Sequence, residues 1–454
     1  MLKKLFGNKL KGDFYKNVLT LFTGRIISHL IPFIVYPVLT RLYTPEEFGV
    51  FALFSSICII LSIIATGNYE LSVMLPEEDK DAFNLVILSI FFNLVFSLIL
   101  TGILFLTEDY LSLLFEGANA RLVIFLIPAS VFFQGIIRTL GNWKNRKKKY
   151  KMISASFITN SGVTTGLQTY LGFMDHGPSG LIGSAVAGQG AAAGILSAGS
   201  FRDYLAMKKY INLKKITELT KRYIKFPKYN LFSQLLNNIS IQIPVFLLTA
   251  LFKKSMNIVG SYSIPHRILS VPVTMIGSSI SQVYFQTASE NRKDKNALNT
   301  ITFDILKKLL LIGVIPFSFV IVYGDIIFTF VYGSEWEIAG HFAQIISPWL
   351  LFVFIASPLS PIFTVLEKQQ LSLLFNIVLF SLRLSSLLVG GLIFKDAYIT
   401  ITLFSATGLL FWIFYTFFIL KLANVNILKA SVFIFSVLGV AIIPVILSRF
   451  LLNI

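Results

Sequence analysis

Two ionisable side chains stand four residues apart in the first long apolar stretch of the chain. Residues 17–40 are mostly apolar but include Arg25 and His29. Residues four apart share one face of a helix, and Arg25 would lie about 12 Å into that helix at 1.5 Å per residue. A guanidinium near the middle of a membrane helix costs about 2.5–3.5 kcal/mol on insertion scales, so it usually has a purpose. The pair indicates an anion-binding face; the alternative is an arginine that reaches back to the membrane surface and serves packing alone.

Further polar side chains occur inside later apolar stretches. Gln234, Asn238 and Gln242 stand at spacing four and predict a stripe of amides on one helix face. Amides both donate and accept, as sugar hydroxyls do, but they also join neighbouring membrane helices. Arg267 lies between two prolines, which free backbone groups as cavity-lining helices often do. Arg383 is also deep in its stretch, and both arginines are candidates for binding an anion.

Three more polar residues are expected at the ends of apolar stretches. Arg41 follows the first stretch, at its outer end, while Asn68 and Glu70 follow the second, at its inner end. We expect Arg41 to line the outer mouth. Asn68 and Glu70 would line the inner mouth or cap a helix. The two glutamates that follow Thr44-Pro45 are best explained by a helix that begins there.

The elements that must position these residues are membrane helices. Of the 454 residues 55% are apolar and 13% are charged, against about 25% charged in soluble domains, and the mean hydropathy is +0.76. A span needs about 20 apolar residues, which predicts an all-α polytopic membrane protein with 13 spans, within a range of 12–14. The expected spans are 17–40, 48–65, 82–106, 122–140, 153–173, 181–200, 229–251, 258–284, 303–331, 341–366, 371–394, 397–420 and 430–450.

Positive charge is distributed unevenly between the two sets of loops. With the N-terminus in the cytoplasm, 27 of the 39 Lys and Arg residues fall in inner segments and six in outer ones, in line with the positive-inside rule. Membrane orientation therefore explains the net charge of +17 better than nucleic acid does. Cys58 is the single cysteine and the four histidines lack ligand spacing. With loops too short for a catalytic domain, we expect no catalytic residue, no metal and no cofactor.

A basic segment near the middle of the chain separates two sets of six expected spans. The predicted parts are an N-terminal lobe at 1–200, a basic cytoplasmic linker at 201–228, a C-terminal lobe at 229–420 and an additional transmembrane helix at 421–454. A shift of 212 residues aligns 14–32 with 226–244 with seven identities in nineteen. Repeats of six spans each are parallel, and substrate sites in such transporters lie between the repeats.

Three stretches carry a resemblance to a known family. They read PVLTRLYTPEEFG after the first span, FALFSSICIILSIIATGNYELSVMLPEEDKDA through the second, and IPHRILSVPVTMIGSSISQVYFQTASE across the eighth. In these stretches the chain resembles the bacterial polysaccharide transporters. These are the O-antigen and capsule flippases of the multidrug/oligosaccharidyl-lipid/polysaccharide exporter superfamily. The likeness covers nearly the whole chain.

The resemblance implies two six-helix lobes around a central cavity, working by alternating access. It implies a flippase that moves undecaprenyl-diphosphate-linked oligosaccharide repeat units from the cytoplasmic to the outer leaflet of the bacterial inner membrane, for surface polysaccharide. In related flippases cavity arginines hold the diphosphate, and Arg25 and Arg267 match that role by position. The lipid-linked oligosaccharide and membrane lipids are the expected partners, with a polymerase and a chain-length regulator of the same pathway as candidates. The coupling ion, proton or sodium, is left open.

Two other functions are alternatives. A drug or cation antiporter of the same fold would be expected to have buried acids in its first lobe, and the deep parts of the first six expected spans contain none. A membrane polymerase or glycosyltransferase of the same pathway would be expected to have a large outer loop or an exposed acidic site, whereas the outer loops are about 15 residues or fewer.

Overall fold

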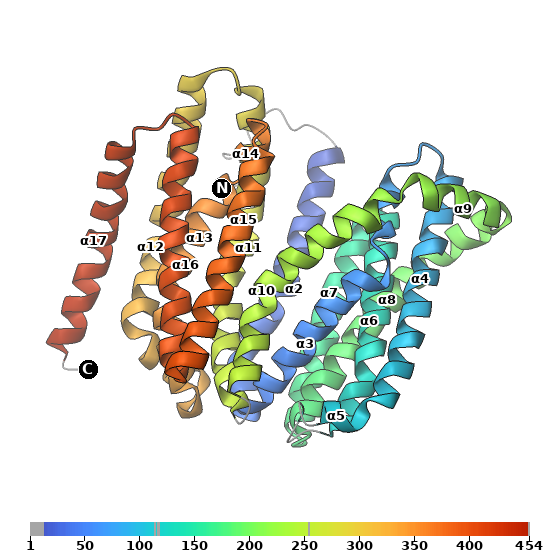
Figure 1. Ribbon diagram of the computed structural model, residues 1–454, viewed down its shortest axis with the longest axis horizontal. Helices are drawn as coiled ribbons and strands as arrows, with labels where there is room; N and C mark the ends of the chain where they lie inside the picture. The colour runs from blue at the N-terminus through green and yellow to red at the C-terminus, as the bar shows by residue number, and fades with distance from the viewer. Residues whose placement is uncertain (1–12, 113–114, 116–118, 253–254, 453–454) are drawn as a thin grey trace. The chain divides into compact units, whose positions relative to one another are not determined.

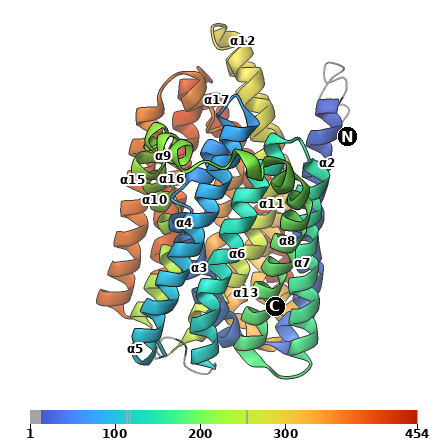
Figure 2. The same ribbon diagram turned by 90° about the vertical axis from the view of Figure 1, so that its right-hand side faces the viewer.

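The computed structural model describes residues 13–112, 115, 119–252 and 255–452, and every regular element in these ranges is a helix (Figures 1 and 2). By compactness the chain divides into two units, of which unit 1 ends at Gln242 and unit 2 begins at Ile243, both within α10. Thirteen of the described helices have 20 residues or more. Each of the thirteen expected spans coincides with one of them, continued in places by a short 3-10 or π turn.

Unit 1 contains the helices up to the first part of α10. They are α2 (Asp13–Leu42), α3 (Pro45–Ala65), η1 (Tyr69–Met74), α4 (Asp79–Leu106), α5 (Glu108–Ser112), α6 (Ala120–Arg146), α7 (Tyr150–Gly172), α8 (Gly177–Met207), η2 (Lys208–Tyr210), α9 (Leu213–Arg222), η3 (Phe226–Asn230) and α10 (Leu231–Leu251). Within the unit α7 packs against α2 and α8, and α6 packs against α3, α4 and α8.

Unit 2 contains the remaining helices. They are α11 (Met256–Glu290), α12 (Lys295–Tyr332), η4 (Ser334–Trp336), α13 (Glu337–Ala356), η5 (Ser357–Leu359), α14 (Ile362–Val365), α15 (Gln369–Leu388), η6 (Val389–Phe394), α16 (Ala397–Leu422) and α17 (Ile427–Leu451). Helix α13 is central, because it packs against α11, α12 and α16. Helix α17 packs mainly on α12.

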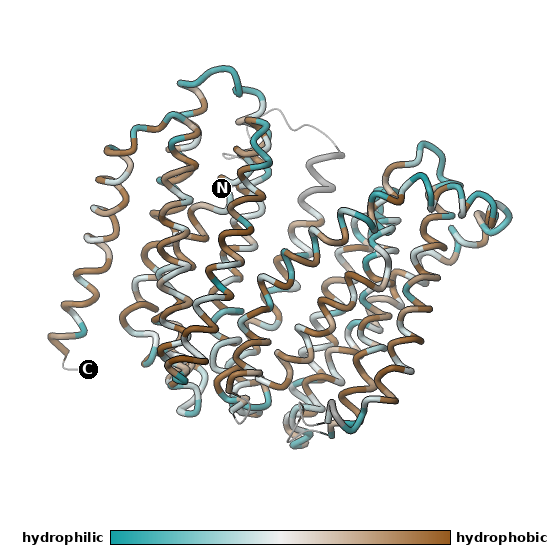
Figure 3. Tube along the Cα trace, in the orientation of Figure 1, coloured by the Kyte–Doolittle hydropathy of each residue, from teal (hydrophilic) through white to brown (hydrophobic). Residues whose placement is uncertain are grey.

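Twelve helices of the described chain are long and apolar enough to cross a membrane. Figure 3 shows apolar residues along most of their length and hydrophilic residues at the connections. The thirteenth long helix, α7, falls below that apolarity because it carries many Ser, Thr, Asn and Gln residues. Its 23 residues would span about 34 Å at 1.5 Å per residue, which is enough to cross a bilayer. The prediction of an all-α polytopic protein with 12–14 spans is therefore confirmed.

The predicted start of a helix after Thr44-Pro45 is also confirmed. The Thr44 hydroxyl accepts from the Glu47 amide at 3.3 Å, and the Glu47 carboxylate accepts from the Thr44 amide at 2.7 Å. This reciprocal pair is a capping box, which satisfies two backbone donors at the start of α3. Tyr43 donates its hydroxyl to the Gln168 carbonyl of α7 at 2.7 Å, so the elbow between α2 and α3 is fixed to the body of unit 1.

The basic segment after α8 is folded onto unit 1. Helix α9 lies at the end of the unit where α4 begins, and Lys215 is 3.5 Å from the Asp81 carboxylate (Figure 2). The Tyr69 hydroxyl donates to the Thr220 carbonyl at 3.2 Å, and Leu219 is fully buried. The apolar side of this helix therefore contributes to the core of unit 1.

Candidate functional site

Arg25 is placed by a close contact between α2 and α7. A side chain at Gly24 would meet Ser154 of α7, and the Ser154 hydroxyl donates to the Thr20 carbonyl of α2 at 2.9 Å. One turn further along α7, the Phe157 ring lies under the Arg25 guanidinium, with 5.7 Å between the guanidinium carbon and the ring centroid. This distance is within the range of a cation–π contact.

The structure brings His29 into the electrostatic range of Arg25. The charge of Arg25 acts on the His29 ring one turn along α2, and both side chains are exposed on the surface of unit 1. Among the described residues Arg25 forms no ion pair with a carboxylate. Its in-plane N–H donors are therefore accessible to an anion from outside the unit.

The amide stripe on α10 mostly serves its own helix and a neighbour. The Asn238 amide donates to the Gln234 carbonyl at 2.8 Å, and Gln242 accepts from the Ser56 hydroxyl of α3 at 3.3 Å. Gln234, Asn238 and Gln242 are all half-buried. Part of each side chain remains accessible, so binding of a ligand by these amides stays a prediction.

The two residues expected to line an inner mouth or cap a helix lie in a buried turn, with Asn68 directly before η1. Asn68 and Glu70 are 0% and 2% exposed, and Asn68 has a left-handed backbone with φ 61°. The Thr66 hydroxyl donates to the Glu70 carboxylate at 2.7 Å. In the amide orientation that gives both of its polar atoms a partner, Asn68 donates to Glu70 at 3.3 Å and accepts from the Leu231 amide at 3.1 Å. The turn therefore links α3 to the start of α10.

Glu70 is a buried acid outside the membrane-spanning helices. Burial raises its pKa above the usual carboxyl range, while the Thr66 hydroxyl and the positive charge of Arg138 act in the opposite direction. Arg138 is a half-buried residue of α6. Arg41, the candidate for the other mouth, is exposed at the last turn of α2.

In unit 2 the structure places Arg383 beside an aromatic group from two other helices. Its guanidinium carbon lies 5.9 Å from the centroid of the Trp349 ring of α13. His266 of α11 stacks between Trp349 and Tyr262, with ring centroids 6.1 Å and 5.5 Å away. The charges of Arg383 and Arg267 both act on His266, and Arg267 is itself exposed on α11.

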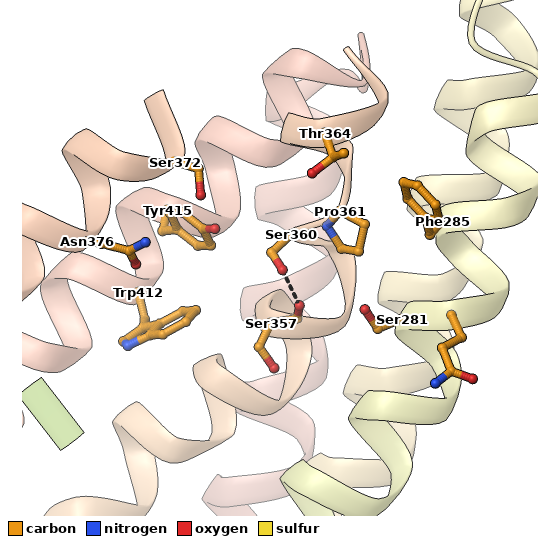
Figure 4. A pocket seen from close by; sticks show the side chains of 11 residues that line it. Ser281, Phe285, Ser357, Ser360, Pro361, Thr364, Ser372, Asn376, Trp412 and Tyr415 are labelled. Carbon is orange, nitrogen blue, oxygen red and sulfur yellow. Dashed lines mark hydrogen bonds between the residues drawn. The ribbon is translucent and has the colours of Figure 1, made fainter. Parts of the chain in front are cut away.

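Unit 2 also contains a pocket that the sequence did not predict. It has a volume of about 530 Å³ and is formed by α11, the segment from η5 to α14, α15 and α16 (Figure 4). Its lining residues are Ser281, Gln282, Phe285, Ser357, Ser360, Pro361, Thr364, Ser372, Asn376, Trp412 and Tyr415. None of them is charged, and most carry a hydroxyl, an amide or an aromatic ring.

Sequence reasoning missed the aromatic partners of the arginines and the whole pocket. Phe157 is one of 44 phenylalanines, so its position beside Arg25 has no signal in one sequence. The spacing of Ser357, Ser360 and Thr364 around Pro361 was a usable sign, because a polar, proline-containing segment within an apolar stretch often lines a cavity.

The sequence of the chain matches a family. Residues 38–340, more than half of the chain, match the family described as "Polysaccharide biosynthesis protein". The chain belongs to this family, and the resemblance noted in the sequence is confirmed at that level. No curated protein matches the chain in sequence.

Solved structures share the fold. The inward-facing conformation of a multidrug resistance MATE family transporter of the MOP superfamily is 14% identical, with a TM-score of 0.65 over 90% of this chain and 98% of the other. The lipid II flippase MurJ, in an inward closed conformation, is 14% identical, with a TM-score of 0.60 over 96% and 100%. A MOP superfamily transporter from Pyrococcus furiosus, described as having a binding pocket of reverse polarity, is 15% identical, with a TM-score of 0.53 over 94% and 97%. The protein is thus a multi-pass membrane protein with the MOP transporter fold.

Proposed function

We propose that the protein is a flippase for undecaprenyl-diphosphate-linked oligosaccharide repeat units. It moves them from the cytoplasmic to the outer leaflet by alternating access, for surface polysaccharide synthesis. Membership of a polysaccharide biosynthesis family and the fold shared with a lipid II flippase support this class of cargo. No step of the proposal requires an enzyme, metal or cofactor.

One observation carries the proposal: each unit holds a guanidinium over an aromatic ring within a membrane-spanning helix. Arg25 lies over Phe157 in unit 1, and Arg383 lies over Trp349 in unit 2. An aromatic ring stabilises the face of a guanidinium without occupying its in-plane donors. The in-plane donors of Arg25 match the oxygens of a diphosphate, which can accept two parallel hydrogen bonds.

Complementation tests the proposal at Arg25. In a bacterial strain that lacks its own flippase for a given repeat unit, we expect the wild-type protein to restore surface polysaccharide, Arg25→Lys to restore part and Arg25→Ala to restore none. Lysine keeps the charge but lacks the planar fork, which is the reason for the intermediate result. Arg222→Ala is the matched control, because Arg222 lies 5.4 Å from the Tyr223 ring but outside the membrane spans. Equal restoration by all variants at equal protein levels would refute the role of Arg25.

A drug or cation antiporter is the second candidate, and buried Glu70 is the observation that favours it. Glu70 is an acid in unit 1 that could bind a proton or a cation. If Glu70→Gln abolished efflux of a cationic dye while Arg25→Ala left it unchanged, the antiporter would replace the flippase. Under the flippase proposal, expression of the wild type produces no dye efflux.

A further inference from the structure

We propose that the pocket in unit 2 binds an uncharged sugar ring. The pocket lies within unit 2 alone, and its volume of about 530 Å³ is in the range of roughly 300–1,000 Å³ that is usual for small-molecule sites. The proposal rests on the proposed function only where it takes the sugar to be part of a lipid-linked repeat unit. The pocket itself is argued from its own chemistry.

Its polar groups do not satisfy each other. The side chains of Ser281, Thr364, Ser372, Asn376 and Tyr415 have no hydrogen-bond partner within the described part of the chain. Most Ser and Thr side chains in membrane helices bond back to a carbonyl of their own helix. In the same unit this is seen at residues such as 318, 347 and 416. The lining groups therefore remain available to a ligand that offers both donors and acceptors.

Tyr415 is the sharpest case. The residue is only 7% exposed, and its ring is packed between Phe375 and Phe411, with centroids 5.1 Å and 5.8 Å away. Figure 4 shows its hydroxyl pointing toward Ser360, whose own hydroxyl donates to the Ser357 carbonyl at 2.8 Å. A phenol that is held rigidly by its neighbours and has no hydrogen-bond partner among the described residues is typical of a preorganised binding group.

The aromatic and uncharged character of the walls selects the class of ligand. Trp412 and Tyr415 come from α16, and Phe285 from α11 stands on the opposite side (Figure 4). The nearby acid Glu367 is in an ion pair with Arg292 at 3.3 Å and is not part of the lining. A charged ligand would enter this site without a counter-ion and would lose its hydration energy. Aromatic rings with several convergent hydroxyl and amide groups and no charge suit a neutral sugar ring.

The position of the pocket relative to Arg383 fits a sugar joined to an anion. Asn376, in the lining, and Arg383 are seven residues apart on α15, which places them on the same helix face about 10 Å apart. A repeat unit whose first sugar occupied the pocket could thus have its diphosphate near Arg383 within the same unit.

The test measures binding of soluble methyl glycosides to the full chain in lipid nanodiscs. Alkyl glycoside detergents must be avoided, because their head groups belong to the expected ligand class. Saturation-transfer NMR should detect neutral methyl glycosides of glucose, galactose, mannose and N-acetylglucosamine, with at least one binding in the millimolar range. Methyl glucuronide should bind at least about tenfold more weakly than methyl glucoside.

Matched variants locate the binding. Asn376→Leu and Tyr415→Phe should weaken binding of the best neutral glycoside by about tenfold and about threefold. Tyr398 is on α16, as Tyr415 is, but lies outside the pocket, so Tyr398→Phe should have no effect on glycoside binding.

Several outcomes would overturn the proposal. They are the absence of binding by every neutral glycoside, equal binding by the wild type and Asn376→Leu, and displacement of the glycoside by a simple fatty acid, which would indicate an acyl-chain pocket. These failures are distinguishable from failure of the proposed function. If the wild-type protein bound no glycoside but still restored surface polysaccharide, the sugar pocket alone would be wrong. If the wild-type protein bound a glycoside but did not restore surface polysaccharide, the flippase assignment would be wrong.

Discussion

A polar cluster holds the end of α17 against α12, and we predict that breaking it releases the helix. The Arg449 guanidinium donates to the two Asp325 oxygens at 3.0 and 2.6 Å. It also donates to the Val322 carbonyl, where the backbone of α12 leaves helical geometry at Tyr323. Gln344 of α13 donates to the same carbonyl and the same carboxylate. The cluster thus joins α12, α13 and α17.

The expected cost of removing Arg449 follows from burial. The side chain of Asp325 is 16% exposed and that of Arg449 is 30% exposed, so the pair is neither fully buried nor on the surface. Disruption of a buried pair costs about 3–5 kcal/mol, and a surface pair contributes about 0–1 kcal/mol. Few other contacts compensate, because Ala430 and Ile434 are the buried residues of α17 in the described structure. We expect Arg449→Met to lower the free energy of unfolding of unit 2 by about 2 kcal/mol.

Thermal unfolding of the purified protein in nanodiscs measures this effect. A loss of about 2 kcal/mol in a unit of this size corresponds to a fall in Tm of about 4–8 °C. Asp325→Asn should give a similar fall, and the double variant should cost clearly less than the sum, because the two residues form one interaction. Arg292→Met is the control, since its pair with Glu367 in the same unit is 53% and 76% exposed and should matter little. A fall no larger than that of the control, or additive single effects, would refute the reasoning.

Three further predictions concern unit 1. Burial raises the pKa of Glu70 in the folded state. The free energy of unfolding should therefore fall as the pH rises from the usual carboxyl range through that raised pKa. Thermal melts at a series of pH values measure this dependence, and Glu70→Gln should remove it. Thr44→Ala removes the capping box of α3 and should cost about 1 kcal/mol by the same melts, with no change if the cap is not formed in solution. Gly188→Leu would force a side chain into the backbone of α7 and should abolish monodisperse purification, whereas Gly183→Leu has open space and should be tolerated.

The positions of the membrane helices, though not their exact limits, could be predicted because bilayer thickness fixes the length of an apolar stretch. The cap at Thr44 could be predicted for a similar reason, since it depends on residues three apart in the sequence. Both signals are local. The span at α7, the long helix that falls below the apolarity of the others, could also be predicted from the sequence. Its omission would reverse the distribution of positive charge in every later loop.

The environment of the candidate residues could not be predicted, because it depends on contacts between distant helices. Arg25 and Phe157 are on α2 and α7, and the pocket joins four segments that extend from Ser281 to Tyr415. The sequence places Glu70 at the end of an apolar stretch, but its burial results from the turn that Asn68 makes toward α10. Without several aligned sequences, one chain gives no sign of which helices meet.

The arginines of this protein differ in the partners that they meet. Arg146 and Arg449 direct their N–H donors at the carboxylates of Asp79 and Asp325, so those donors are used within the fold. Arg25 instead lies over the Phe157 ring inside a membrane span and forms no ion pair with a carboxylate among the described residues, whereas Arg449 has both an aromatic ring, that of Tyr323, and the Asp325 carboxylate. A ring lowers the cost of keeping a cation in an apolar environment but leaves the in-plane donors of the guanidinium for another acceptor. A protein that needed the Arg25 cation only for stability would gain more from a carboxylate beside it, and this contrast is the physical reason to look for an anionic cargo.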